Sequence, residues 1–196
     1  MTEENYICTK CISVGSFGKI YQTTLDNYVV KKIKFDRNFG INSILELYII
    51  TFINHQNIMF CNSKIIGKEH IEYMMPKANY DTTKLMKREI SAKQFKQICF
   101  DICKGIYELH RRNILHGDIK PNNIVYFEEF NNTKIIDFGK SIIINKSGIN
   151  NIKDKNFYAK SFRPPEIYSD NIITLKADIW ALGCTFYEYK FKTHFF

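Results

Sequence analysis

The spacing of apolar residues changes near Pro76, and this change constrains the fold more than any other feature of the 196-residue chain. Before Pro76 the apolar residues come in short alternating runs, which are typical of strands, with one helix-like segment at residues 41–53. After Ser91 they recur at every third or fourth position, as on a helix. The pattern predicts an α+β fold in which a strand-rich small lobe precedes a helix-rich larger lobe.

The same reading predicts individual elements. Strands are expected at residues 7–11, 19–24, 28–35, 65–66 and 70–75, and the helix at 41–53 is apolar on so many sides that more than one face should be covered. Pro76 and the polar residues after it predict a boundary between lobes at residues 1–76 and 77–196 of a single domain. Beyond it we expect a helix capped by Ser91, a hairpin of strands 124–127 and 133–136, and a helix at 176–187.

Composition excludes several classes of protein. With 45% hydrophobic and 15% aromatic residues, the chain can bury a core and is not disordered throughout. Its apolar runs are too short to span a membrane and its acidic start does not resemble a signal peptide, so we expect a soluble cytoplasmic protein without a membrane partner. The net charge of +8 favours anionic partners, but the lysine excess accompanies abundant Ile and Asn, which share A/T-rich codons. We therefore do not expect nucleic-acid binding.

The six cysteines are scattered along the chain and do not suggest a secreted disulfide framework. Cys8 and Cys11 have the spacing of a zinc knuckle, but no second Cys or His pair follows at a usable distance. We predict reduced, buried thiols.

Gly15-Ser16-Phe17-Gly18 is the first candidate for a ligand site. Glycines let backbone N–H groups approach phosphate oxygens closely. The segment is neither a Walker loop nor a dinucleotide fingerprint, because no Gly-Lys-Ser/Thr ends it and a strand follows it. Taken alone, an ordinary glycine hairpin explains it equally well.

Lys31 is more informative. In an extended strand it shares a face with Val29 and Ile33, where an ammonium group needs a partner. Glu46, the one acid in the apolar helix that follows, has the same need. We expect the two to form an ion pair. These residues alone do not decide whether the pair is purely structural or belongs to a functional site.

The most specific segment is His116-Gly117-Asp118-Ile119-Lys120-Pro121-Asn122-Asn123, with Asp137-Phe138-Gly139 after the next hairpin. The hairpin should bring Asp118, Asn123 and Asp137 to one end of a two-stranded ribbon. Two carboxylates and an amide oxygen there could hold Mg²⁺, which prefers hard oxygen ligands. The alternative is a set of turn-forming Asp and Asn residues, although the complete ordered set is less readily explained by chance.

In this order, from residue 12 to about residue 190, the motifs resemble those of eukaryotic-type protein kinases. The resemblance implies a bilobal protein-kinase-like fold, with an antiparallel-sheet N-lobe that has one helix and a mostly helical, truncated C-lobe. It also implies ATP and Mg²⁺ between the lobes and transfer of the γ-phosphate to a protein hydroxyl. Lys120, two residues after Asp118, matches the serine/threonine pattern, and His116 is expected to be structural.

The resemblance assigns roles residue by residue. Asp118 matches the catalytic aspartate, Lys120 the lysine that steadies the transferred phosphoryl group, and Asn123, also counted as catalytic, binds the metal with Asp137. The nucleotide-binding set comprises the glycine-rich loop, the lysine–glutamate pair and the hinge: Ile12, Ser13, Val14, Gly15, Ser16, Phe17, Gly18, Lys19, Ile20, Lys31, Glu46, Met75 and Ala78.

Three substitutions depart from the family pattern. Ser13 replaces the first glycine of the loop, and its small side chain should still allow phosphate binding. Gly117 replaces an arginine, which makes control by an activation-loop phosphate less expected. Ala159 stands where a threonine hydroxyl usually supports Asp118 and Lys120.

The chain also ends where the family has three further helices. We therefore expect the helix that begins near Asp178 to expose apolar surface, and the protein to self-associate or to bind a protein partner that completes the C-lobe. A compact kinase with A/T-rich codons is expected from a large DNA virus or from an A/T-rich microbe. If the source is a virus, the expected location is the cytoplasm of the host cell. A pseudokinase that binds nucleotide or a partner without efficient catalysis is the main alternative, and a small-molecule phosphotransferase is a weaker one.

Overall fold

The computed structural model describes residues 6–15, 18–35, 40–152 and 157–195. The chain divides into two compact units, one of Met1–Asn54 and Met59–Lys77 and the other of His55–Ile58 and Ala78–Phe196. His55–Ile58 thus belong to the second unit although they precede Pro76. A sheet-rich unit followed by a helix-rich one confirms the predicted α+β class.

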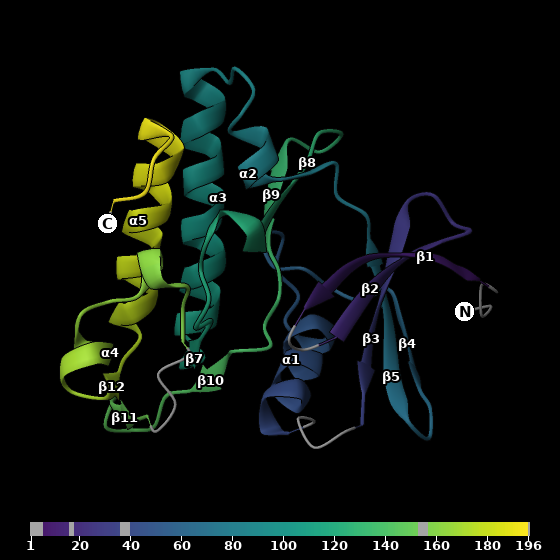
Figure 1. The fold of residues 1–196 in the computed structure, drawn as a ribbon, viewed down its shortest axis with the longest axis horizontal. Helices are drawn as coiled ribbons and strands as arrows, with labels where there is room; N and C mark the ends of the chain where they lie inside the picture. Colours follow the sequence, from purple (N-terminus) through teal and green to yellow (C-terminus); the bar gives the residue numbers. More distant parts are fainter. Residues whose placement is uncertain (1–5, 16–17, 36–39, 153–156, 196) are drawn as a thin grey trace. The chain divides into compact units, whose positions relative to one another are not determined.

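The first unit is a five-stranded antiparallel sheet with one helix (Figure 1). The strands lie in the order β1-β2-β3-β5-β4. Their bounds are Cys8–Gly15 (β1), Gly18–Thr23 (β2), Tyr28–Lys34 (β3), Ser63–Ile66 (β4) and His70–Pro76 (β5), and the helix α1 is Ile41–Phe52. Because β3 lies at the centre of the sheet and pairs with β5 along its whole length, Lys31 is placed opposite Tyr73.

Helix α1 buries one face and exposes the other. Leu45, Ile49 and Ile50 belong to the core, whereas the exposed apolar side chains are spaced three or four residues apart. They are Ile41, Ile44, Tyr48 and Phe52. The expectation that α1 would be covered on more than one side is wrong for this face, since the apolar pattern does not distinguish a covered face from an exposed one.

The second unit contains the longer helices (Figure 1). Its main helices are α3 (Ala92–His110) and α5 (Lys176–Phe191), and its largest sheet has the strand order β6-β8-β9. The remaining bounds are Tyr80–Asp81 (β6), Thr82–Leu85 (α2), Ile114–Leu115 (β7), Pro121–Asn123 (η1), Ile124–Phe127 (β8), Asn132–Ile135 (β9), Ile142–Ile143 (β10), Asn150–Asn151 (β11), Lys160–Phe162 (η2), Glu166–Ser169 (α4) and Ile172–Ile173 (β12).

Helix α3 forms as its sequence predicts. The Ser91 hydroxyl accepts a hydrogen bond from the backbone N–H of Gln94 at 3.1 Å, which caps the helix. Its periodic apolar residues are at most 2% exposed and form the core of the unit: Ile98, Ile102, Ile106 and Leu109. Strand β9 packs against this helix.

Helix α5 exposes part of its apolar surface. Ile179 is 52% exposed and Trp180 37%, while Leu182 on the same helix is only 7% exposed. Near the end of the chain, Phe191 and Phe195 both pack against the ring of Tyr187 and remain more than half exposed. Some apolar surface is therefore exposed here as expected, but Leu182 does not contribute to it.

The six cysteines lie among the described residues, and each has a free thiol. Only Cys184 is buried, while Cys11 and Cys103 are exposed. The prediction of buried thiols is therefore wrong for most of them, because apolar neighbours in sequence do not fix the face on which a cysteine lies. Among the described residues, no helix combines the length and hydropathy needed to cross a bilayer.

Candidate functional site

In the first unit, Lys31 and Glu46 form a buried ion pair. Lys31 is 6% exposed on β3 and Glu46 is 1% exposed on α1, and the Lys31 ammonium donates to Glu46 Oε1. The hydroxyl of Tyr73 on β5 donates to the same oxygen at 2.6 Å. Tyr73 was not expected from the sequence, although its register opposite Lys31 puts it on the same face of the sheet. The three side chains fix the position of the lysine ammonium.

The other carboxylate oxygen, Glu46 Oε2, is buried and has no hydrogen-bond partner in the described part of the chain. A buried carboxylate oxygen without a donor is costly. A hydrogen bond to this oxygen, from a bound molecule or from Lys31 after a small movement, would therefore stabilise the site.

The glycine-rich segment joins β1 and β2. Gly15 pairs with Gly18 across the antiparallel strands, while Ser16 and Phe17 lie outside the described residues. Gly18 has φ +143°, and a Cβ there would lie 2.6 Å from the carbonyl oxygen of Lys32. Glycine is thus required at 18 by the sheet itself. On the strands flanking the turn, Ile12, Ser13, Val14 and Lys19 are exposed and Ile20 is half-buried.

The predicted hinge residues lie around the end of β5. Met75 is 8% exposed in the strand, and the backbone N–H of Lys77 donates to the carbonyl oxygen of Asn27 at 2.8 Å. Ala78 is half-buried and begins the second unit. The hydrogen bond to Asn27 fixes the backbone directly before Ala78.

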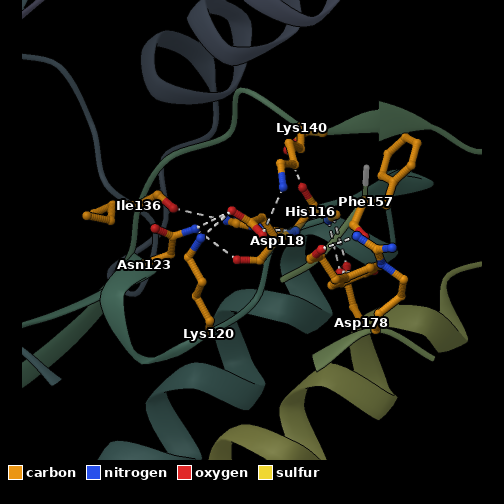
Figure 2. A network of polar contacts seen from close by, with 12 residues as sticks. His116, Asp118, Lys120, Asn123, Ile136, Lys140, Phe157 and Asp178 are labelled. Carbon is orange, nitrogen blue, oxygen red and sulfur yellow. Dashed lines mark hydrogen bonds and ion pairs between the residues drawn. The ribbon is translucent and has the colours of Figure 1, made fainter. Parts of the chain in front are cut away.

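In the second unit, polar groups converge on the carboxylate of Asp118, which is 5% exposed (Figure 2). The Lys120 ammonium donates to Oδ2 at 2.8 Å, and the Asn123 amide donates to the backbone carbonyl of Asp118 at 2.8 Å and to Oδ2 at 3.2 Å. The Lys140 ammonium donates to the second oxygen, Oδ1, at 3.2 Å. Each carboxylate oxygen therefore has a cationic donor.

The β8–β9 hairpin brings Asn123 beside Ile136, which directly precedes Asp137. Asn123 precedes β8 directly, and the backbone N–H of Ile136 donates to its carbonyl oxygen at 3.0 Å. Asp137 follows at once with φ +62°, a left-handed conformation that non-glycine residues adopt rarely. Asp118, Asn123 and Asp137 thus lie at one end of the hairpin, where the topology was expected to bring them.

His116 joins the two loops. Its Nδ1 accepts a hydrogen bond from the backbone N–H of Asp118 at 3.2 Å, so Nε2, 3.0 Å from the carbonyl oxygen of Ile136, acts as the donor there. The ring also packs edge-on against Phe138 at 5.3 Å. His116 is fully buried and holds Asp118 relative to the Asp137 segment, which fits the structural role expected for it.

Asp178 of α5 holds the backbone of the loop that leads to Asp118. Its carboxylate is fully buried and accepts hydrogen bonds from the backbone N–H groups of His116 and Gly117 at 2.8 and 3.1 Å. It also accepts one from the Tyr158 hydroxyl at 2.7 Å, and the His110 ring lies 2.9 Å away. Burial alone would raise the pKa of Asp178, but the hydrogen bond with His110 and the nearby His116 lower it overall. Asp178 therefore stays ionised and binds its donors strongly.

Tyr158 and Gly117 hold the backbone of the loop that carries Asp118. Tyr158, next to Ala159, is 1% exposed, and its backbone N–H donates to the carbonyl oxygen of Gly117 at 3.0 Å. Gly117 has φ +80°, and a Cβ there would lie 2.6 Å from the carbonyl oxygen of Lys140. Since any larger residue at 117 would strain the backbone, the glycine permits the close approach of Lys140.

The polar groups near Asp118 fit a magnesium ion. Because the amide nitrogen of Asn123 is turned toward Asp118, its carbonyl oxygen remains as a hard ligand at the end of the hairpin that leads to Asp137. The described residues contain no group of three or more His, Cys, Asp or Glu that could hold a metal by themselves. A magnesium ion that takes few protein ligands and completes its shell with water and phosphate oxygens suits this donor set.

Comparison with known proteins finds protein kinases in each case. The protein kinase domain family matches residues 6–196. The chain is 29% identical over 193 residues to calcium-dependent protein kinase 6 of Plasmodium berghei, covering 93% of this chain and 13% of that protein. It is 30% identical over 203 residues to the serine/threonine-protein kinase par-4 of Caenorhabditis elegans, covering 94% and 33%. It is 32% identical over 137 residues to the serine/threonine-protein kinase shk2 of Schizosaccharomyces pombe, covering 68% and 23%. The chain thus spans a third or less of the length of these three relatives.

Proposed function

We propose that this chain, which belongs to the protein kinase domain family, is an ATP- and Mg²⁺-dependent kinase that phosphorylates serine or threonine hydroxyls of proteins. The observation that supports the proposal most is the cluster around Asp118, a buried carboxylate held by Lys120 and Asn123 at the end of the hairpin that leads to Asp137. The serine/threonine class rests on Lys120, two residues after Asp118, and on the two relatives named as serine/threonine kinases.

Asp118 is proposed to orient the acceptor hydroxyl. A carboxylate oxygen accepts the hydrogen bond of the hydroxyl and takes its proton as the new bond from oxygen to the γ-phosphorus forms and the bond from that phosphorus to the leaving oxygen of ADP breaks. Asn123 and His116 hold the Asp118 backbone, so the carboxylate is positioned before the substrate arrives. Lys120 places a positive charge beside Asp118, where it stabilises the negative charge of the transferred phosphoryl group.

Lys31 is proposed to bind the phosphates of the nucleotide. Its pairing with Glu46, itself held by Tyr73, fixes the ammonium in one position. Asn123 and Asp137 would hold Mg²⁺, which neutralises phosphate charge during the transfer. The backbone of the glycine-rich segment and the residues Met75 and Ala78 complete the proposed nucleotide site.

The direct test is transfer of radiolabel from the γ-phosphate of ATP to a generic basic protein, with and without Mg²⁺. We expect labelled serine or threonine with the unmodified chain and none with Asp118→Asn, which keeps the size of the side chain but removes its charge. Nucleotide binding without transfer by a correctly folded chain would contradict the proposal and favour a pseudokinase.

A further inference from the structure

The Lys140 ammonium binds Oδ1 of Asp118, the carboxylate oxygen with more room for an acceptor hydroxyl. Oδ2 already accepts from Lys120 and Asn123, whereas among the described residues Oδ1 accepts from Lys140, at 3.2 Å (Figure 2). Each carboxylate oxygen has two lone pairs, so Oδ1 has room for one further donor. A hydroxyl bound there would lie within about 6 Å of the Lys140 ammonium, the most that two successive hydrogen bonds allow.

The backbone of Lys140 is held independently of its side chain. Its carbonyl oxygen packs against Gly117, too close for any Cβ at that position. The next residue, Ser141, donates its backbone N–H to the carbonyl oxygen of Phe138 at 2.9 Å and its hydroxyl to that of His116 at 3.2 Å. The ammonium group can therefore change partner while the loop keeps its position, and its side chain is 26% exposed.

Cations outnumber acids in the described part of the segment that begins at Lys140. Its described residues up to Arg163 include four cationic side chains, Lys140, Lys146, Lys160 and Arg163, and no acidic one. Among the described residues, Arg163 donates to the backbone carbonyls of Phe157 and Tyr158 and lies over the Tyr168 ring, but pairs with no acidic side chain. The surroundings of the acceptor position therefore favour a negatively charged peptide.

We propose that Lys140 makes the kinase selective for protein segments with an acidic side chain next to the acceptor serine or threonine. This inference rests on the proposed function and names its substrate class. When the acceptor hydroxyl binds Asp118 Oδ1, the neighbouring carboxylate takes over the Lys140 ammonium. A neutral substrate segment offers the Lys140 ammonium no such partner, so a neutral segment should bind less well at Asp118.

The expected selectivity is about tenfold. A fully exposed ion pair contributes less than this, but the side chain of Lys140 is only a quarter exposed, so its charge is less screened by water. A tenfold difference in kcat/KM corresponds to about 1.4 kcal/mol.

The test uses two fluorescent peptides that differ only in having Glu or Gln on both sides of one serine. Steady-state phosphorylation and equilibrium binding, the latter by fluorescence anisotropy, are measured for the unmodified chain, Lys140→Met, Lys140→Arg and the control Lys146→Met. Lys146 is exposed in the same basic segment, so the control removes the same charge away from Asp118.

We expect the unmodified chain and Lys146→Met to prefer the Glu peptide about tenfold, chiefly through KM. Lys140→Met should lower kcat/KM for the Glu peptide until the two peptides are used equally, and Lys140→Arg should retain most of the preference. Equal use of both peptides by the unmodified chain would overturn the proposal. So would a loss of kcat in Lys140→Met that is the same for both peptides, because Lys140 would then only position Asp118.

Binding separates this inference from the proposed function. If no peptide is phosphorylated but the Glu peptide still binds more tightly in a manner that depends on Lys140, the selectivity stands and the kinase activity does not. If phosphorylation occurs and neither binding nor kcat/KM distinguishes the peptides, the kinase activity stands and the selectivity is refuted.

Discussion

Replacing Tyr158 with Phe should destabilise the second unit, because it removes one hydrogen bond from the buried carboxylate of Asp178. The phenol donates to Asp178 at 2.7 Å, and both side chains are almost completely buried. Phe keeps the ring and its packing. A hydrogen bond to a charged group contributes about 1.5–3 kcal/mol, so we expect a loss of about 2 kcal/mol in the free energy of unfolding.

The fluorescence of the single tryptophan, Trp180, reports on this change, because it lies two residues after Asp178 in α5. In urea, a loss of about 2 kcal/mol should lower the unfolding midpoint by about 1 M for a unit of this size. The matched control is Tyr107→Phe on α3, where the side chain is 70% exposed and the expected change is below about 0.5 kcal/mol. A Tyr158→Phe variant no less stable than Tyr107→Phe would refute the anchoring role given to Asp178.

Three further predictions follow from the same contacts. Mg-ATP well above its dissociation constant should raise the melting temperature by several degrees, and Lys31→Met should abolish the shift in differential scanning fluorimetry. The folded-state pKa of Asp178 lies below its ordinary 3.8, so the unfolded chain binds more protons in acid than the folded chain does. The contribution of Asp178 to stability should therefore be complete above about pH 4 and fall as the pH drops further, which urea titrations at a series of pH values can measure. The exposed apolar side chains of α5 should cause self-association in sedimentation experiments across a concentration series, and Ile179→Lys with Phe191→Lys should reduce it; a monomer at every concentration would contradict this.

The sequence predicted the parts of the site that depend on local pattern. Alternation along the strand placed Lys31 among apolar neighbours, and the search for a buried acid led to Glu46. The hairpin predicted at residues 124–127 and 133–136 is confirmed as two antiparallel strands, which bring the loops on either side together.

The sequence did not reveal the contacts that depend on tertiary approach. Lys140, between Gly139 and Ser141, has the sequence surroundings of a solvated loop, and only the packing of its carbonyl against Gly117 brings its ammonium to Asp118. Tyr158 likewise reaches Asp178 across 20 positions of sequence. Apolar periodicity also could not predict which apolar residues of α1 and α5 stay exposed, because it identifies a face without identifying what covers it.

The roles given to the two aspartates can be separated by measuring ATP affinity and phosphoryl transfer in parallel. Asp118 is assigned to the acceptor hydroxyl and Asp137 to the metal, so the two variants should differ. We expect Asp118→Ala to abolish transfer while ATP binds nearly as tightly as before, and Asp137→Ala to weaken binding of Mg-ATP as well. Both assays need only the purified chain, ATP, Mg²⁺ and one protein substrate.

Transfer of the γ-phosphate by the unmodified chain, measured beside Asp118→Ala, decides whether this protein is a kinase that uses Asp118. We expect Mg²⁺-dependent phosphoserine or phosphothreonine with the unmodified chain, and ATP binding without product in the variant. A folded, ATP-binding unmodified chain that forms no product, or an Asp118→Ala variant that transfers phosphate at an undiminished rate, would contradict it.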